Sequence, residues 1–175
     1  MGGNKLESIL IRGARQLLTA RGDRAPRSGP SLNELNVIQD GAVLIQDGIL
    51  VEVGPSRRVE NLAQARNAIE INAAGRVVMP GFVDAHTHLA FPPAGIHTSD
   101  LAAAAQAVHT ATGQRLAMRT RAYLEAMTRH RTTTVEAKTG CGLDLGAETK
   151  LLRMLYSLRK EPLDLIPSLD RKSVV

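Results

Sequence analysis

The sequence predicts an α/β chain in which a small antiparallel sheet precedes parallel strands that are joined by helices. Residues 8–53 hold short apolar runs separated by turn residues, a pattern typical of antiparallel strands. Residues 77–169 alternate between strand-like and helix-like periods, which favours parallel strands with right-handed crossovers. We therefore divide the chain into a β domain at residues 1–76 and an α/β domain at residues 77–175.

Two Asp-Gly pairs organise the expected antiparallel sheet. They lie at residues 40–41 and 47–48, each between apolar runs, and Asp-Gly favours two-residue hairpin turns because both positions tolerate positive φ. Gly and Pro residues between positions 20 and 36 indicate an exposed loop. The expected strands are residues 8–11 with 16–19, 37–39, 42–45, 49–53, 69–71 and 77–79, and a short helix is expected within 55–68.

Helices alternate with strands in the second half of the chain. Asp100 can cap a helix, and Leu116, Leu124 and Met127 approximate an apolar stripe at helical spacing. Asp144 and Glu148 fit capping and dipole stabilisation at the start of a later helix. The expected helices are residues 101–108, 112–129 and 147–159, and the expected strands are the β-branched run 132–138 and residues 163–169.

Two histidines end the strand that begins this second half. Residues 80–89 read Pro-Gly-Phe-Val-Asp-Ala-His-Thr-His-Leu, a Pro-Gly turn followed by a short apolar strand. Because successive strand side chains alternate faces, Asp84, His86 and His88 are expected to point the same way. Two imidazoles on one face can bind a single metal ion and leave coordination positions open for water and substrate. We expect Asp84 either to orient a ligand histidine or to hydrogen-bond to the backbone.

Other polar residues allow both a functional and a structural interpretation. Lys138 can meet an anionic substrate group, or it can pair with Glu136 or solvent. Cys141 can be a reactive thiol, but nothing in the sequence lowers its pKa, so a small loop residue is the favoured interpretation. The histidines outside the motif, which are expected at the surface or at helix ends, are His97, His109 and His130.

Composition restricts the function classes. The net charge is +5, from 22 Lys and Arg against 17 Asp and Glu, but the arginines are spread over expected helix faces without interleaved aromatics. A solvated surface is therefore favoured over a nucleic-acid site. A single cysteine excludes an internal disulfide and fits a reducing compartment. No apolar run is long enough to cross a membrane and residues 1–6 lack a signal-peptide pattern, so a cytoplasmic location is expected.

The residues around the histidine strand resemble those of a known family. The strand at residues 80–89, with an antiparallel sheet before it, resembles the metal-dependent amidohydrolase superfamily. Within that superfamily, Thr-Thr-Val-Glu-Ala-Lys-Thr-Gly-Cys-Gly-Leu-Asp-Leu at 133–145 and Glu-Thr-Lys-Leu-Leu-Arg at 148–153 are similar to imidazolonepropionase. The resemblance covers nearly the whole chain but only the N-terminal portion of that enzyme.

The resemblance implies a fold and a chemistry. The fold is the start of a (β/α)₈ barrel, about three strands long, preceded by half of a small β-sandwich. His86 and His88 would bind a zinc or iron ion at the C-terminal face of the barrel. The metal would lower the pKa of bound water to about 7, and the resulting hydroxide would open a cyclic amide. In the family, this reaction converts imidazolone propionate to formimino-glutamate during histidine breakdown, and the full-length enzyme is expected to be a homodimer.

The chain differs from the family pattern at several places. The family's remaining metal ligands come from later strands, and residues 91–95 stand where a substrate-binding arginine is usual. Cys141 occupies the position of a substrate-contacting tyrosine, and Arg131 occupies the position of a helix-ending glycine. Three hypotheses follow: an imidazolonepropionase-like hydrolase, another amidohydrolase such as a deaminase or a different cyclic amidase, and a catalytically inert truncated chain.

Overall fold

The computed structural model describes residues 7–22, 25–90, 100–159 and 162–170, which form two compact units, Met1–Pro80 and Gly81–Val175. The expected loop at residues 91–95 and His97 lie outside the described residues. The boundary lies four residues later than the expected one, because β5 (Val77–Val78) pairs with β1 (Ser8–Leu18) in the first unit. No helix among the described residues is long and apolar enough to span a membrane.

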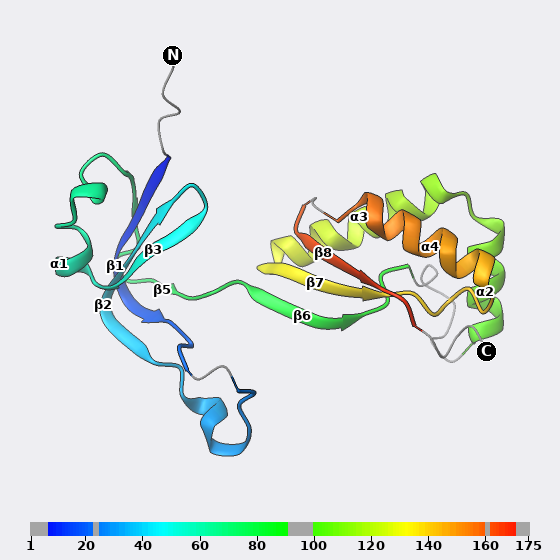
Figure 1. The fold of residues 1–175 in the computed structure, drawn as a ribbon, viewed down its shortest axis with the longest axis horizontal. Helices are drawn as coiled ribbons and strands as arrows, with labels where there is room; N and C mark the ends of the chain where they lie inside the picture. Colours follow the sequence, from blue (N-terminus) through cyan, green and yellow to red (C-terminus); the bar gives the residue numbers. More distant parts are fainter. Residues whose placement is uncertain (1–6, 23–24, 91–99, 160–161, 171–175) are drawn as a thin grey trace, which may run out of the picture. The chain divides into compact units, whose positions relative to one another are not determined.

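The first unit is built around β1, which is the most extensively paired strand of its sheet (Figure 1). The sheet order is β3-β2-β1-β4, with β5 also paired to β1. β2 is antiparallel to both β1 and β3, whereas β4 and β5 run parallel to β1. The expectation of a purely antiparallel sheet is therefore wrong. The remaining bounds are Val37–Gln46 for β2, Ile49–Pro55 for β3, Ile69–Asn72 for β4, Ser56–Val59 for α1, and Gly29–Asn33 and Ala63–Ala65 for two 3₁₀ turns, η1 and η2.

Only one of the two Asp-Gly pairs forms the expected hairpin turn. Asp47 and Gly48 connect β2 to β3 with φ values of 49° and 78°, which is type I′ chemistry. Asp40 and Gly41 instead lie inside β2, so the hairpin expected there is wrong. Asp40 does adopt a positive φ of 46°, but the register of β1 against β2 shifts next to this place, between Ile11 and Ala14. The positive φ therefore accompanies a bulge and does not reverse the chain.

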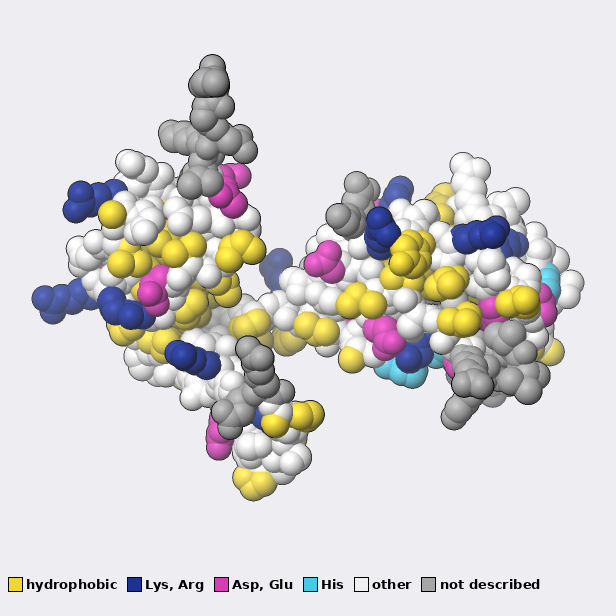
Figure 2. All heavy atoms as spheres, in the orientation of Figure 1, with side chains coloured by type: hydrophobic (Ala, Val, Ile, Leu, Met, Phe, Trp, Pro, Cys, Tyr) yellow, Lys and Arg dark blue, Asp and Glu magenta, His cyan; other side chains and the backbone are white. Residues whose placement is uncertain are grey.

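Alternating side chains give the first sheet an apolar cluster on each face. Leu10, Ala42 and Leu44 pack with Val59 of α1 on one face, while Leu17 and Val43 pack in the second cluster. Several apolar residues of the unit nevertheless remain exposed. Figure 2 shows hydrophobic side chains at the surface of both units, and in the first unit these include Ile49, Leu50, Val51, Ile69, Ile71 and Val77.

The second unit is a three-stranded parallel sheet with helices packed on one face (Figure 1). The sheet order is β6-β7-β8, and both neighbouring pairs are parallel, which confirms the expected strand–helix alternation. The bounds are Phe82–Thr87 for β6, Leu101–Thr110 for α2, Gly113–Arg129 for α3, Thr132–Lys138 for β7, Leu145–Ser157 for α4 and Asp164–Ser168 for β8. The described strands form the α/β layer that was expected, and the closed barrel remains a prediction from the resemblance.

Burial alternates along β7 and separates the two faces of this sheet. Val135 and Ala137 are fully buried in the core under the helices, whereas Thr134, Glu136 and Lys138 are partly exposed. On the neighbouring strands, Val83 is 67% exposed and Ile166 is 56% exposed. The described residues therefore cover one face of the sheet and leave hydrophobic side chains exposed on β6 and β8.

Candidate metal centre

The two histidines of the motif lie side by side at the carboxyl end of β6. Their ring centroids are 5.3 Å apart and the ring planes are inclined by 65°, so both rings are on the same side of the backbone. His86 is exposed and His88 is partly buried. Because parallel strands all end at the same edge of a sheet, the ends of β7 and β8 lie at this edge too, which is where ligands bind in α/β folds.

The alternation of side chains along β6 is less regular than the sequence suggests. The register of β6 against β7 shifts between Asp84 and Thr87, which indicates a bulge before the second histidine. Asp84 lies on the exposed part of the strand, and its Oδ1 accepts a hydrogen bond of 3.3 Å from the backbone N–H of His86. Of the two roles expected for Asp84, the structure shows the bond to the backbone.

A main-chain carbonyl fixes the ring of His88. The Nδ1 atom of His88 is 2.9 Å from the carbonyl oxygen of Thr139, which follows β7. Since a carbonyl oxygen can only accept, this hydrogen bond requires the proton on Nδ1 and leaves the lone pair of the neutral ring on Nε2. A hydrogen bond from the ring nitrogen that does not bind the metal is the usual support of a metal-binding histidine.

Glu136 and Lys138 form an ion pair on the same edge of the sheet. Lys138 Nζ donates to Glu136 Oε1 over 3.0 Å, so the structure shows the pairing that was one of the two expectations for this lysine. The hydrogen bond from Lys138 lowers the pKa of Glu136, and the charge of nearby His86 adds a smaller effect in the same direction. The carboxylate of this ion pair therefore lies within electrostatic reach of His86.

Cys141 lies in the core and not at the surface. It is 1% exposed, inside the apolar cluster beneath the helices, and burial raises the pKa of its thiol to about 12. The substrate contact expected for this position would require the loop after β7 to move. Asp144, by contrast, performs the expected capping role, because its Oδ1 accepts from the N–H of Ala147 at the start of α4.

Two residues that form or contact the loop after β7 were missed as site residues. Thr139 contributes through its backbone carbonyl, which carries no signature in the sequence. Glu148 was expected only to favour the helix dipole, but it is fully buried and accepts hydrogen bonds from the N–H groups of Gly140 and Gly142. A signal was present, since a glycine-rich loop exposes backbone donors and an acidic residue follows it on the next helix turn.

The donor set of this edge fits part of a metal site. Neutral imidazoles suit zinc and iron, and the two rings lie close enough together to serve one ion. Within the described ranges, no group of three or more His, Cys, Asp or Glu side chains could hold an ion. Two histidines would therefore supply only part of a metal's ligand set, and a complete site would need further ligands.

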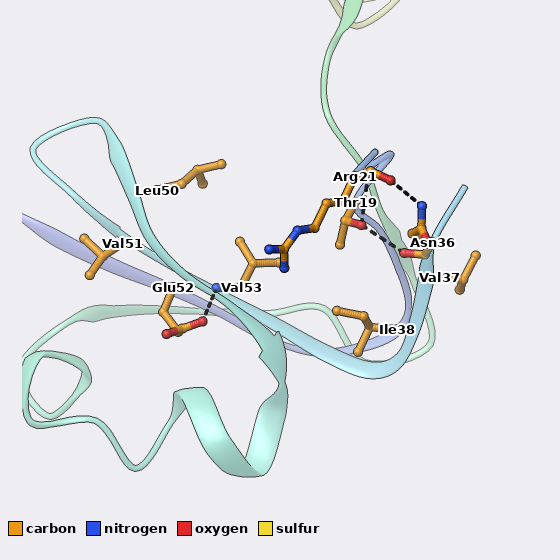
Figure 3. A pocket seen from close by; sticks show the side chains of 9 residues that line it. All are labelled: Thr19, Arg21, Asn36, Val37, Ile38, Leu50, Val51, Glu52 and Val53. Atoms are coloured by element: carbon orange, nitrogen blue, oxygen red, sulfur yellow. Dashed lines mark hydrogen bonds between the residues drawn. The ribbon is translucent and has the colours of Figure 1, made fainter. Parts of the chain in front are cut away.

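A cavity elsewhere in the chain lacks comparable chemistry. It has a volume of about 610 Å³ and lies in the first unit, between β2, β3 and the chain after β1 (Figure 3). Two of its polar side chains bond to main-chain carbonyls of the wall: the Thr19 hydroxyl donates to the Asn36 carbonyl, and the Asn36 amide donates to the Arg21 carbonyl. The remaining wall is mainly aliphatic. This cavity therefore lacks a pair of imidazoles like the one at the end of β6.

Comparison with solved structures identifies the class of fold. The chain superposes on guanine deaminase from Bradyrhizobium japonicum with a TM-score of 0.61 at 17% identity, covering 97% of this chain and 38% of that one. It also superposes on atrazine chlorohydrolase from Arthrobacter aurescens TC1, complexed with zinc, with a TM-score of 0.65 at 16% identity, covering 92% and 35%. These neighbours are amidohydrolase-superfamily enzymes, and this chain has the fold of the part of each that it aligns with.

Comparison with curated proteins shows which members of the superfamily this chain is similar to. The chain is 36% identical to imidazolonepropionase of Solibacter usitatus over 164 residues, and 35% identical to that of Parabacteroides distasonis over 176 residues. These alignments cover 84% and 90% of this chain but only 39% and 42% of the relatives. No family model matches. The chain is a homologue of the imidazolonepropionases that spans about two-fifths of their length.

Proposed function

We propose that this chain supplies the first two metal ligands of an amidohydrolase that opens a cyclic amide C–N bond, with imidazolone propionate as substrate and formimino-glutamate as product. One observation carries the proposal. His86 and His88 lie ring beside ring at the carboxyl end of β6, in a chain that is similar to imidazolonepropionases. A cytoplasmic location and a homodimeric full-length enzyme belong to the same proposal.

The described residues would have different roles at this site. A zinc or iron ion, when bound, would supply a Lewis acid and a hydroxide nucleophile at neutral pH. His88 would hold the ion through Nε2, because its Nδ1 is committed to the carbonyl of Thr139. His86 would be the second ligand. Lys138 would exchange its bond to Glu136 for one to the anionic propionate group of the substrate.

Metal affinity tests the ligand assignment directly. Zinc or cobalt is titrated into the 175-residue chain and into the variants His86→Ala, His88→Ala and the double variant. Each single substitution should weaken binding at least tenfold, because losing one of two imidazoles leaves a single protein ligand. His130→Ala, at the end of α3, is the matched control and should retain the affinity. Equal affinity in the double variant and the original chain would contradict the assignment of the two histidines as metal ligands.

A substrate panel separates the three functional hypotheses. The metal-loaded chain is assayed with imidazolone propionate, with other cyclic amides and with aminated bases. Preferential opening of imidazolone propionate supports the proposal, whereas faster release of ammonia from an aminated base would favour a deaminase. Because two histidines are only part of a ligand set, metal binding without turnover of any compound would indicate a chain that is inert by itself.

A further inference from the structure

A buried carboxylate fixes the loop that follows β7. Glu148, in the first turn of α4, has a fully buried side chain. Its two oxygens accept hydrogen bonds of 2.7 Å from the N–H of Gly140 and 2.5 Å from the N–H of Gly142. A buried carboxylate is costly unless it is satisfied in this way, so the loop and the helix stabilise each other.

Glycine allows the loop to approach the helix this closely. A Cβ atom at position 142 would lie 2.6 Å from the Cβ of Ala147 and 3.0 Å from the backbone nitrogen of Glu148. Gly140 adopts a φ of 110°, a conformation that is strained for any residue with a side chain. The path of the loop is therefore determined by its contact with the start of α4.

The same loop carries the carbonyl that orients His88. Thr139 is fully buried, its N–H donates to the carbonyl of Ser168 over 3.0 Å, and its hydroxyl accepts from the N–H of Asp170 over 3.1 Å. Its carbonyl oxygen faces Nδ1 of His88 at 2.9 Å. Thr139 is thus held by β8 on one side and by the Glu148 loop on the other.

We propose that Glu148 is a positioning residue for His88. Its carboxylate holds the Thr139–Gly142 loop, the Thr139 carbonyl holds the proton on Nδ1, and the Nε2 lone pair of His88 is thereby fixed for a metal ion. The metal in this chain of contacts rests on the proposed function, whereas the orientation of the ring does not. Support of this kind behind a ligand histidine is typically worth 10–100-fold in metal affinity.

The metal-free ring of His88 gives the first test. Long-range ¹H–¹⁵N spectra at pH 8 distinguish the two neutral tautomers of each imidazole, and the His88→Gln spectrum assigns the resonance. The original chain should show the proton of His88 on Nδ1. Glu148→Gln replaces one acceptor oxygen by an N–H donor facing a backbone N–H, so it should shift His88 towards the Nε2–H tautomer. If Glu148→Gln fails to fold, Gly142→Ala displaces the same loop and should give the same shift.

Metal titration gives the second test, and a capping variant is the control. Glu148→Gln should weaken zinc or cobalt binding by 10–100-fold. Asp144→Ala weakens the start of the same helix by removing its cap, but it leaves the loop contacts intact, so its affinity should stay within about twofold. An unchanged tautomer in Glu148→Gln or Gly142→Ala, or an equal loss of affinity in Asp144→Ala, would overturn the proposal.

The two tests distinguish a failure of the proposed function from a failure of the positioning role. If the original chain binds no metal through its histidines, the proposed function is wrong, while the tautomer measurement still decides whether Glu148 positions His88. If metal binds normally but the tautomer does not respond to Glu148→Gln, only the positioning role is wrong.

Discussion

Lys150 of α4 caps the end of α2 through the backbone of Val108. Its Nζ donates over 2.9 Å to the carbonyl oxygen of Val108 and also donates to the carbonyl of Ala111. The last carbonyls of a helix lack partners within the helix and carry its negative end, so a cation there is favourable. A single side chain thus joins two helices that lie on the same face of the sheet.

Replacing this lysine should destabilise the second unit. We expect Lys150→Met to lower the free energy of unfolding by about 1–2 kcal/mol, because it leaves partly buried carbonyls without a charged donor while keeping the aliphatic stem. Urea unfolding followed by circular dichroism measures the change. Arg153→Met, an exposed cation on the same helix, should change stability by less than about 0.5 kcal/mol. Equal losses in the two variants would contradict the capping role.

Arg131 follows α3 in a conformation that favours glycine. Its φ is 72°, and its N–H donates to the carbonyl of Thr128 over 2.9 Å. A left-handed conformation costs a residue with a side chain about 1–2 kcal/mol of stability, and glycine avoids this cost. Glycine in turn costs about 0.5–1 kcal/mol, because it loses more backbone entropy on folding. Arg131→Gly should therefore raise the melting temperature, with a net gain of about 0.5–1 kcal/mol. Arg121→Gly, within the same helix, should lower it by a similar amount.

Alanine substitution should change stability in opposite directions at two glycines. A Cβ at Gly41 would lie 2.4 Å from the Cβ of Leu17 on the neighbouring strand, so Gly41→Ala must push β1 and β2 apart. We expect a loss of about 1–3 kcal/mol. Gly113 begins α3 and has open space around it, so Gly113→Ala should gain about 0.4–1 kcal/mol. Chemical denaturation measures both, and a neutral Gly41→Ala would contradict the close approach of the two strands.

The buried thiol of Cys141 should be unreactive in the folded chain. With a pKa of about 12, about one molecule in ten thousand carries a thiolate at pH 8, and the side chain is shielded from solvent. Reaction with a disulfide reagent at pH 8 should therefore be slow in buffer and fast in concentrated urea. Fast labelling of the folded chain would show that the loop after β7 opens readily.

The same pKa makes stability depend on alkaline pH. Because the folded pKa is raised above the unfolded value of about 8.5, the folded state keeps its proton while the unfolded state loses it. This contribution is fully present below pH 8.5 and is lost progressively as the pH rises towards 12. Cys141→Ala should reduce the slope of stability against pH between about 9 and 11, whatever its effect on packing at neutral pH.

Local chemistry predicted much of the fold. The hairpin at Asp47-Gly48, the caps at Asp100 and Asp144 and the strand at β7 all follow from neighbouring residues, and the structure contains them. The hairpin expected at Asp40-Gly41 failed because the dipeptide lies beside a bulge in β1, a strand distant in the sequence. The parallel pairing of β4 with β1 was missed for the same reason, since long-range pairing leaves no local pattern.

In the candidate site too, local features could be predicted from the sequence and long-range contacts could not. The proximity of His86 and His88 follows from a spacing of two residues, so the motif was sufficient to predict it. The contact between His88 and the Thr139 carbonyl joins residues 51 positions apart and uses only main-chain atoms on one side. The burial of Glu148 depends on how the loop after β7 packs against α4, which the helix pattern alone does not determine.

The pairing of β1 has a consequence for synthesis of the protein. β1 is synthesised before all of its partners, which extend to Val78 at the end of the unit. β2 can pair with one edge of β1 soon after it, whereas the other edge, which pairs with β4 and β5, stays unpaired until about sixty further residues have emerged. Slow translation of the segment between β1 and β5 would lengthen the time for which this edge of β1 stays unpaired.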